Sequence, residues 1–564
     1  MLAETLPAAA PRTDASARPA SSSWPEWLGL VLLLVAAAGL RALRWQGTSL
    51  MFNDGPAFLM LAKSLGEGRF ADALAHPYHP LYPFLVLVTH FWVGDWERAA
   101  VLVSAIAGAA SVLCLWLFVR ASLGRRAAWI AAVFLAVQPN AIEDSADIQS
   151  DGLYLALFLA GVLFLWWALR ERRAALAGWS GIFAGLAYLA RPEGLGIVAI
   201  GAGLFALYAL LGRWRLSGAS RCIAALVAAS LLMALPYLTL LRVQNGSWTL
   251  TQKKSTARLL GFEEGGPAEL LWGPLRPLRP APAPDRANAE PVAPAAAPSD
   301  TATAPREAAA APHGPAAGLL RAALAVLFSA LRAVRPWFLA LVLAGVWMRR
   351  GRPGPLGEVV LAFLAFYGVV LLMQAYHYGY AGTRHALPPM VLTFGYFALA
   401  VPVLGSLLLW PIERVRGAHA SPRLAAGAGL ALVVVIALGQ ALRPERPGTR
   451  AERAAAQWLA TSGGTPGAVA APKVRIAYYA GRAHVSLYAL PRGDALVGSL
   501  RQQGARYVIL EEKKLSEFPE IGAAAGGALR VVHVEEDRGR RALVYELSDA
   551  GAAAAAAPSS PEGR

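Results

Sequence analysis

Eleven apolar runs, most of them close to 20 residues long, limit what this chain can fold into more than any other feature. A helix needs about 20 apolar residues to cross a hydrocarbon core about 30 Å thick. Only 16% of the 564 residues are charged, whereas a soluble domain carries about 25%. We therefore predict an all-α polytopic membrane protein with about eleven spans. The predicted spans are 27–43, 98–119, 127–142, 151–169, 177–190, 193–212, 222–242, 319–348, 356–375, 386–411 and 424–441.

The distribution of arginine predicts the orientation. The stretch from Trp179 to Leu211 is too long for one span, and we divide it at Arg191-Pro192, because proline after a charged residue favours a break. With a cytoplasmic N-terminus, five cytoplasmic loops then hold three arginines each, as the positive-inside rule requires. The net charge of +16 is thus explained by membrane orientation, and no nucleic-acid partner is expected. These arginines are Arg120, Arg125, Arg126, Arg170, Arg172, Arg173, Arg213, Arg215, Arg221, Arg349, Arg350, Arg352, Arg414, Arg416 and Arg423.

Nearly all candidate catalytic and binding residues are expected on the opposite, extracytoplasmic side. Its segments are 46–98, 143–151, 191–193, 243–318, 376–385 and everything after 442. The two cysteines, Cys114 and Cys222, lie in or beside apolar runs without a metal-binding spacing, so they indicate packing rather than a disulfide scaffold.

Composition divides the chain into modules. We predict a disordered tail at 1–23, a membrane domain at 24–442, a small α/β extracytoplasmic domain at 450–548 and a second disordered tail at 549–564. Proline and alanine at 274–317 indicate a disordered insert in an outer loop. Within the α/β domain the pattern predicts helices near 452–460 and 495–503 and strands at 474–479, 507–510, 531–534 and 542–547.

Asn53-Asp54-Gly55-Pro56 follows the first span and precedes an amphipathic stretch that fits a short helix on the outer leaflet. Asp54 can cap that helix or act as a general base at the membrane boundary, and the two roles are compatible. His76-Pro77-Tyr78-His79-Pro80 makes a rigid loop that suits a sugar or metal site. An ordinary interfacial aromatic belt is the alternative for this loop.

Four acidic residues precede the fourth span. If the segment is helical, Asp144, Asp147 and Asp151 share a face, and such oxygens suit Mg²⁺ or Mn²⁺. A solvated helix N-terminus with Glu143 is the alternative. A divalent cation is therefore possible, and no cofactor is certain.

Ionisable groups also interrupt later apolar stretches. Arg191 and Glu193 are functional candidates for this reason, with a mutual ion pair as the alternative. The aromatic residues of 376–385, Tyr378 among them, can offer rings to a sugar, and Arg384 suits phosphate oxygens. Lys253 can also meet an anionic headgroup, although a solvated loop is the simpler interpretation.

The chain resembles bacterial members of the GT-C superfamily, related to dolichyl-phosphate-mannose protein mannosyltransferases (glycosyltransferase family 39-like). The matching pieces are Asp54, HPYHPLYP at 76–83, SADIQSDGLY at 145–154, YLARPEG at 188–194 and TRHALPPMVL at 383–392. Many relatives have Asp-Glu at the first motif, whereas this chain has Asp54-Gly55. The resemblance therefore leaves Asp54 as the catalytic base.

The resemblance implies a glycosyltransferase that moves a hexose or pentose from a polyprenyl-phosphate carrier to a protein, lipid or glycan acceptor. It also implies a multi-pass cell (inner) membrane protein whose active site and C-terminal domain are extracytoplasmic. The expected substrate-binding residues are His79, Asp151, Arg191, Glu193, Tyr378, Arg384 and Lys253. A transporter or flippase for a lipid-linked sugar is the alternative. Transporters often have matching helix breaks in two halves, and the sequence shows one clear break.

Overall fold

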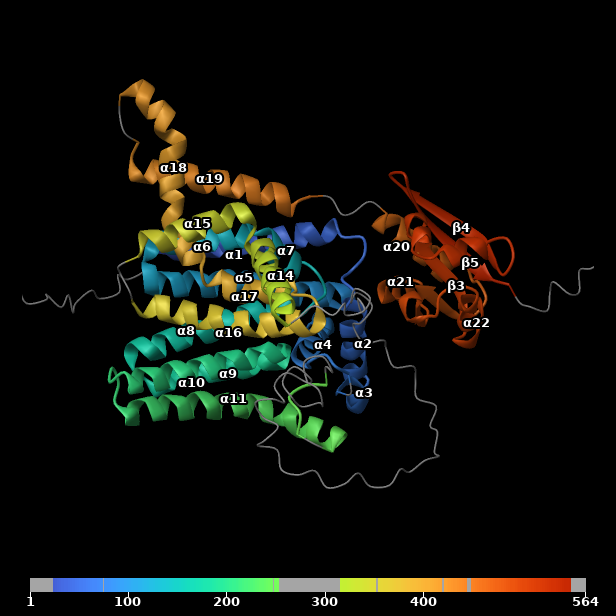
Figure 1. The fold of residues 1–564 in the computed structure, drawn as a ribbon, viewed down its shortest axis with the longest axis horizontal. Coiled ribbons are helices and arrows are strands. Elements are labelled where there is room, and N and C mark those ends of the chain that lie inside the picture. Colours follow the sequence, from blue (N-terminus) through green and yellow to red (C-terminus); the bar gives the residue numbers. More distant parts are fainter. Residues whose placement is uncertain are drawn as a thin grey trace, which may run out of the picture.

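The computed structural model describes residues 24–74, 76–246, 248–252, 315–350, 354–417, 420–443 and 448–548. In it, a body of side-by-side helices carries a small sheet domain beyond one end (Figure 1). The expected tails, Lys253 and residues 274–314 of the expected insert lie outside the described residues.

The helical body contains nine described helices that are long and apolar enough to cross a membrane, together with three shorter apolar helices. Short helices α2 and α3 run across the helix ends that face the sheet domain (Figure 1), as expected for an interfacial segment. The helices are α1 Trp24–Gln46, α2 Gly55–Gly66, α3 Phe70–Leu74, α4 Leu81–Val93, α5 Trp96–Leu123, α6 Arg125–Val137, α7 Pro139–Ser145, α8 Asp151–Glu171, α9 Ala174–Ala190, α10 Leu195–Leu210, α11 Leu216–Asn245, α14 Pro315–Val334, α15 Pro336–Met348, α16 Pro355–Tyr378, α17 Thr383–Val391, α18 Phe394–Arg416 and α19 Pro422–Ala441.

Three expected spans are divided. The run at 127–142 ends as α6 at Val137, and Pro139 opens the separate helix α7. The run at 319–348 is α14 and α15, separated by Arg335, whose φ of 74° is left-handed. The run at 386–411 is divided between α17 and α18. Two of these breaks coincide with a proline, which cannot donate the next helical hydrogen bond.

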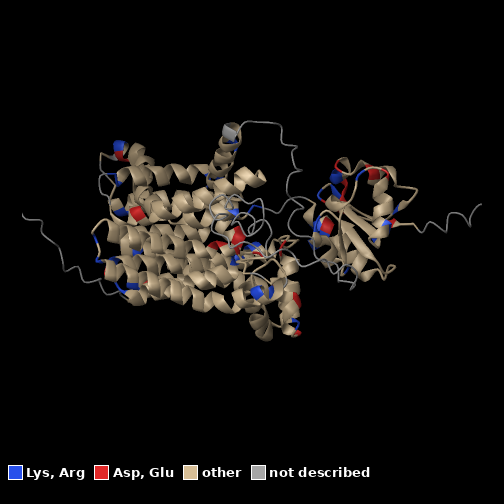
Figure 2. Cartoon of the chain, turned by 60° about the horizontal axis from the view of Figure 1, so that its bottom comes forward, with Lys and Arg blue, Asp and Glu red and all other residues tan. Residues whose placement is uncertain are grey.

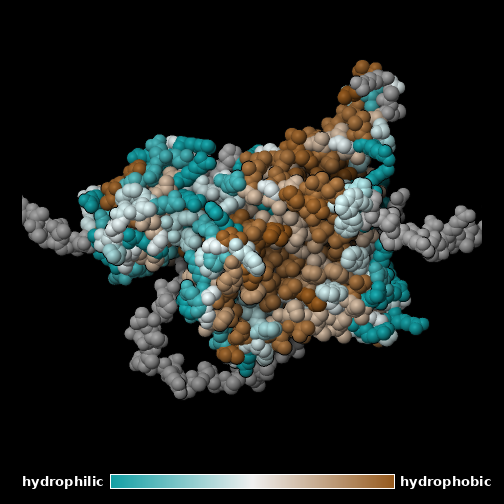
Figure 3. Space-filling model, turned by 180° about the vertical axis from the view of Figure 1, so that it is seen from behind, coloured by the Kyte–Doolittle hydropathy of each residue, from teal (hydrophilic) through white to brown (hydrophobic). Residues whose placement is uncertain are grey.

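The helix ends confirm that the arginine-rich turns share one end of the body. Figure 2 shows Lys and Arg lining the end away from the sheet domain. Buried Glu26 at the start of α1 pairs there with Arg120 at 3.4 Å and Arg125 at 3.2 Å. Apolar side chains cover much of the outer surface of the body between its two ends (Figure 3), as expected for a surface that faces lipid.

Close packing of α9 against α11 depends on two glycines four residues apart. A Cβ on Gly181 would stand 2.2 Å from the carbonyl oxygen of Leu226, and one on Gly185 would stand 2.8 Å from that of Ser230. Small residues at this spacing let membrane helices approach closely, where the hydrophobic effect gives no driving force. This contact fixes α9, and with it the break that follows α9.

The C-terminal domain is a five-stranded mixed sheet in the order β2-β1-β3-β5-β4. β1 is parallel to β2 and β3, while β5 is antiparallel to β3 and β4. The run at 474–479 is helix α21 and not the expected strand. The strand precedes it as β1, which ends before Pro472, a residue that cannot donate to a ladder. The elements are α20 Thr449–Thr461, β1 Ala468–Ala471, α21 Val474–Tyr479, β2 His484–Ser486, α22 Ala495–Gln502, β3 Ala505–Glu511, α23 Pro519–Ala523, β4 Leu529–Asp537 and β5 Arg540–Leu547.

Candidate functional site

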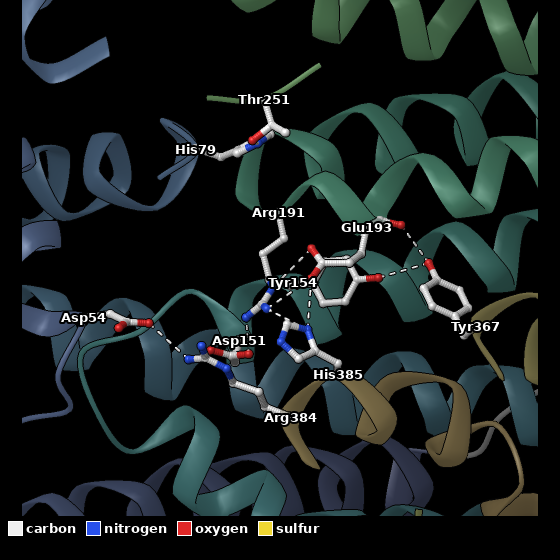
Figure 4. A network of polar contacts seen from close by, with 10 residues as sticks. All are labelled: Asp54, His79, Asp151, Tyr154, Arg191, Glu193, Thr251, Tyr367, Arg384 and His385. Carbon is white, nitrogen blue, oxygen red and sulfur yellow. Dashed lines mark hydrogen bonds and ion pairs between the residues drawn. The ribbon is translucent and has the colours of Figure 1, made fainter. Parts of the chain in front are cut away.

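Four segments that are far apart in the sequence meet at the end of the body that faces the sheet domain. Asp54 precedes α2, Asp151 opens α8, Arg191 and Glu193 lie at the break between α9 and α10, and α17 carries Arg384. Their side chains converge from different elements into one network of ion pairs (Figure 4). The polar candidates from these four segments are thus brought together.

Asp54 and Arg384 form the first half of the network. Asp54 occupies the N-cap position of α2, but its side chain makes no capping hydrogen bond. Instead the carboxylate accepts a hydrogen bond of 3.1 Å from Arg384. Asp54 is 7% exposed, so the pair is largely shielded from solvent. The Arg384 guanidinium also lies 5.3 Å from the centre of the Phe52 ring.

The charge of Arg384 is stabilised by its neighbours. Burial alone would lower its pKa, but the negative charges of Asp151 and Asp54 outweigh this effect and raise the pKa above its ordinary value. The guanidinium therefore stays protonated and can bind an anion bidentately.

Arg191 is the centre of the second half. It donates to Asp151 and to Glu193 at 3.2 Å, and its guanidinium lies 3.1 Å from Nδ1 of His385. Its backbone is extended, with φ −157° and ψ 141°, as the residue before a proline prefers. The predicted break at Arg191-Pro192 is confirmed, and it turns this side chain toward α8 and α17. The mutual ion pair with Glu193 is also present, as one part of a larger set.

Three residues of the network, His385, Tyr154 and Tyr367, were not among the site residues expected from the sequence. Nδ1 of His385 lies 3.0 Å from Glu193, and burial lowers the pKa of His385. The Tyr367 hydroxyl donates to the Glu193 carbonyl at 2.8 Å and lies 3.1 Å from the Tyr154 hydroxyl. Polar groups within apolar helices α8 and α16 were the signal that could have found the two tyrosines.

The three acids considered for a metal do not share a helical face. α7 ends at Ser145 and α8 begins at Asp151, with non-helical backbone between them. Asp147 accepts from the backbone N–H groups of Phe52 at 3.0 Å and Ile148 at 2.7 Å. Burial raises the pKa of Asp144, and the negative charges of Asp151 and Glu143 raise it further. Among the residues that the structure describes, no group of three or more His, Cys, Asp or Glu residues could hold a metal ion.

Of the expected binding residues, His79 lies apart from the ion pairs. His79 is buried, with Nδ1 2.6 Å from the Tyr188 carbonyl oxygen and Nε2 3.3 Å from the Thr251 hydroxyl, and Figure 4 shows it away from the network. It ties the first outer loop to the end of α9. Tyr378 is the half-buried last residue of α16.

His76, in the first outer loop, makes the stability of the folded chain depend on pH. Burial lowers its pKa to about 4, against the raising effect of Asp54, so the imidazole is neutral near pH 7. The unfolded chain binds more protons than the folded chain between about pH 6.5 and pH 4, and stability therefore falls as the pH falls through this range. We expect acidification from about pH 7 to about pH 5 to lower the unfolding temperature more in the wild type than in His76→Gln. Thermal unfolding in detergent measures this difference, and equal shifts would contradict it.

Comparisons with known proteins agree with this architecture. Residues 75–239 match the family described as Dolichyl-phosphate-mannose-protein mannosyltransferase. ArnT from Cupriavidus metallidurans, solved with undecaprenyl phosphate, has a similar structure at 14% identity and a TM-score of 0.55, over 93% of this chain and 98% of that one. The Archaeoglobus fulgidus oligosaccharyltransferase is similar at 16% identity and a TM-score of 0.53, over 87% of this chain and 71% of that one. No curated protein sequence matches the chain.

The structural matches confirm the predicted fold class, a helical membrane body of the GT-C kind with a small C-terminal sheet domain. The matched range includes the motifs at 76–83, 145–154 and 188–194, and it leaves out Asp54 and Arg384. The resemblance stated from the sequence is therefore confirmed, whereas the roles of these two residues depend on geometry alone.

Proposed function

Starting from the GT-C fold of this chain, we propose that it is a glycosyltransferase that moves a sugar from a polyprenyl-phosphate carrier to an acceptor. The acceptor is a protein, a lipid or a glycan. The observation that carries the proposal is the contact between Asp54 and Arg384 at the helix ends that face the sheet domain. The pair supports the proposal because a carboxylate suited to a general base lies beside a guanidinium suited to phosphate oxygens.

The two members of this pair have complementary roles. Arg384 binds the carrier phosphate, because a guanidinium matches phosphate oxygens bidentately. The phosphate then competes with Asp54 for Arg384, and the carboxylate is released toward the acceptor. The ion pair is in this view the resting state of the site.

In the transfer step the bond between sugar C1 and the carrier phosphate oxygen breaks, and a bond between C1 and the acceptor nucleophile forms. The nucleophile's proton passes to Asp54, which acts as general base. The phosphate leaves as an anion stabilised by Arg384. Since phosphate is already a good leaving group, no general acid is required.

In this proposal Arg191 has a supporting role and does not contact the carrier. It forms the ion pairs with Asp151 and Glu193, so Arg384 is left to pair with Asp54 or with the carrier phosphate. Two similar structures were solved with a bound anion. ArnT contains undecaprenyl phosphate, and a structure of the Archaeoglobus enzyme contains zinc and sulfate. These structures support an anion site in this fold.

The proposed location is the extracytoplasmic side of the cell membrane. The arginine-rich turns occupy the opposite end of the body (Figure 2), and the positive-inside rule assigns that end to the cytoplasm. Lipid-linked donor and membrane lipids are then the partners within the bilayer, and the acceptor approaches from outside.

The test uses purified protein in liposomes with radiolabelled polyprenyl-phosphate hexoses and pentoses and a membrane extract as acceptor pool. We expect label to move from carrier to acceptor only when protein is present. Passage of intact carrier-linked sugar across the bilayer, without cleavage at C1, would instead identify a transporter and contradict the proposal.

A further inference from the structure

The C-terminal domain touches the membrane body at the loop that leads to Asp54. Arg453 on α20 donates to the carbonyl oxygen of Ser49 at 2.7 Å, and Arg475 on α21 donates to that of Met51 at 2.9 Å. We propose that this domain clamps the loop 47–54, with Arg453 and Arg475 as positioning residues for Asp54. The catalytic part of this inference rests on the proposed function.

The loop is connected directly to the site. Immediately after Met51, Phe52 donates its N–H to Asp147 at 3.0 Å, and its ring lies below the Arg384 guanidinium. Asp54 follows two residues later and accepts from Arg384. A displacement of the Met51 carbonyl would therefore move Phe52, which touches both Asp147 and Arg384.

Packing leaves this part of the loop little freedom. Met51 and Leu50 are almost fully buried. A Cβ on Gly55 would stand 2.7 Å from the Met51 sulfur and 3.4 Å from Ile148, so Met51 fills the space beside the start of α2. A side chain at position 55 would require Met51 to shift, so the start of α2 and Met51 are packed against each other.

α21 makes further contacts that fix the domain on the body. The Tyr479 hydroxyl donates to Glu97 at the start of α5 at 3.4 Å, and the Arg453 guanidinium lies 4.6 Å from the centre of the Tyr479 ring. Lys63 of α2 lies 5.9 Å from the Tyr478 ring. The domain thus holds both the loop before Asp54 and the helix after it.

Hydrogen exchange of the full-length protein tests the clamp independently of activity. In the Arg453→Ala/Arg475→Ala variant we expect amides of residues 47–55 to exchange at least about tenfold faster, because the two charge-assisted hydrogen bonds are lost. The exposed arginine Arg530 on β4 provides the matched control, and Arg530→Ala should leave this exchange unchanged. Unchanged exchange in the double variant would overturn the clamp, whatever the chemistry of the site.

Kinetics test the positioning role. We expect kcat of the double variant to fall about 10- to 100-fold, as for a slightly misplaced catalytic group, while KM for the carrier changes by less than about threefold. Arg475→Lys, which keeps a donor, should retain part of the activity that Arg475→Ala loses. A raised KM for acceptor with unchanged kcat would instead make the domain an acceptor-binding surface and overturn the proposal. A wild type without transfer activity would refute the proposed function, and the exchange result would still stand.

Discussion

Asp54→Asn is expected to lower kcat about 10²- to 10⁴-fold, the range that a positioned general base contributes. Asparagine has nearly the same shape and can still accept a hydrogen bond from Arg384, so the surrounding geometry is retained. It cannot take the acceptor's proton. Single-turnover transfer from a radiolabelled polyprenyl-phosphate sugar measures the effect, and the unfolding temperature in detergent shows whether the variant remains folded.

Asp72→Asn is the matched control for this substitution. Asp72 is an exposed acid of the same outer segment, on α3, where it pairs weakly with Arg69 at 3.5 Å. It should transfer sugar at the wild-type rate. Equal turnover of folded Asp54→Asn and wild type would remove Asp54 as the base.

Arg191→Gln is expected to lower the free energy of unfolding by about 3–5 kcal/mol, the usual cost of breaking a buried ion pair by removing one partner. Arg191 is 9% exposed and binds Asp151 and Glu193. Its loss removes the ion-pair partner of the buried Asp151 carboxylate. Unfolding of the detergent-solubilised protein by increasing SDS measures the change.

Two comparisons make this prediction specific. Arg213→Gln breaks a more exposed pair with Glu358, of 2.7 Å, and should cost less than about 1 kcal/mol. Adding Asp151→Asn to Arg191→Gln should recover part of the lost stability, because the unpaired charge is removed as well. A cost for Arg191→Gln no larger than that for Arg213→Gln would show that Arg191 does not hold these acids.

The meeting of Asp54 with Arg384, separated by 330 positions in the sequence, follows from topology. Apolar runs and arginine loops fix which ends of the spans lie together, and both residues were predicted on the same side for this reason. The break at Arg191-Pro192 was predictable because proline acts locally. The apolar pattern thus gives the side of the membrane on which a residue lies.

Contacts within that side were not predictable. Arg191 contacts His385 and Asp151. These contacts depend on side-chain rotamers and on how the helices pack, and the spacing of residues in the sequence does not show either. Tyr367 lies in the middle of α16, and its hydroxyl within an apolar run could have marked it as a candidate but could not have shown its contacts with Glu193 and Tyr154. The acids 144, 147 and 151 were placed on one helical face, because the spacing alone cannot show that the helix ends at Ser145. At 474–479, a six-residue segment that is mostly apolar was too short to distinguish helix from strand.

The central claim is that carrier phosphate replaces Asp54 on Arg384, and binding of a polyprenyl phosphate to two variants tests it most directly. Arg384→Gln should weaken binding about 10- to 100-fold, the value of one or two charge-assisted hydrogen bonds. Asp54→Asn should bind at least as tightly as the wild type, since the competing carboxylate is gone, although it no longer transfers sugar. An equal loss of binding in both variants, or full binding by Arg384→Gln, would contradict the account.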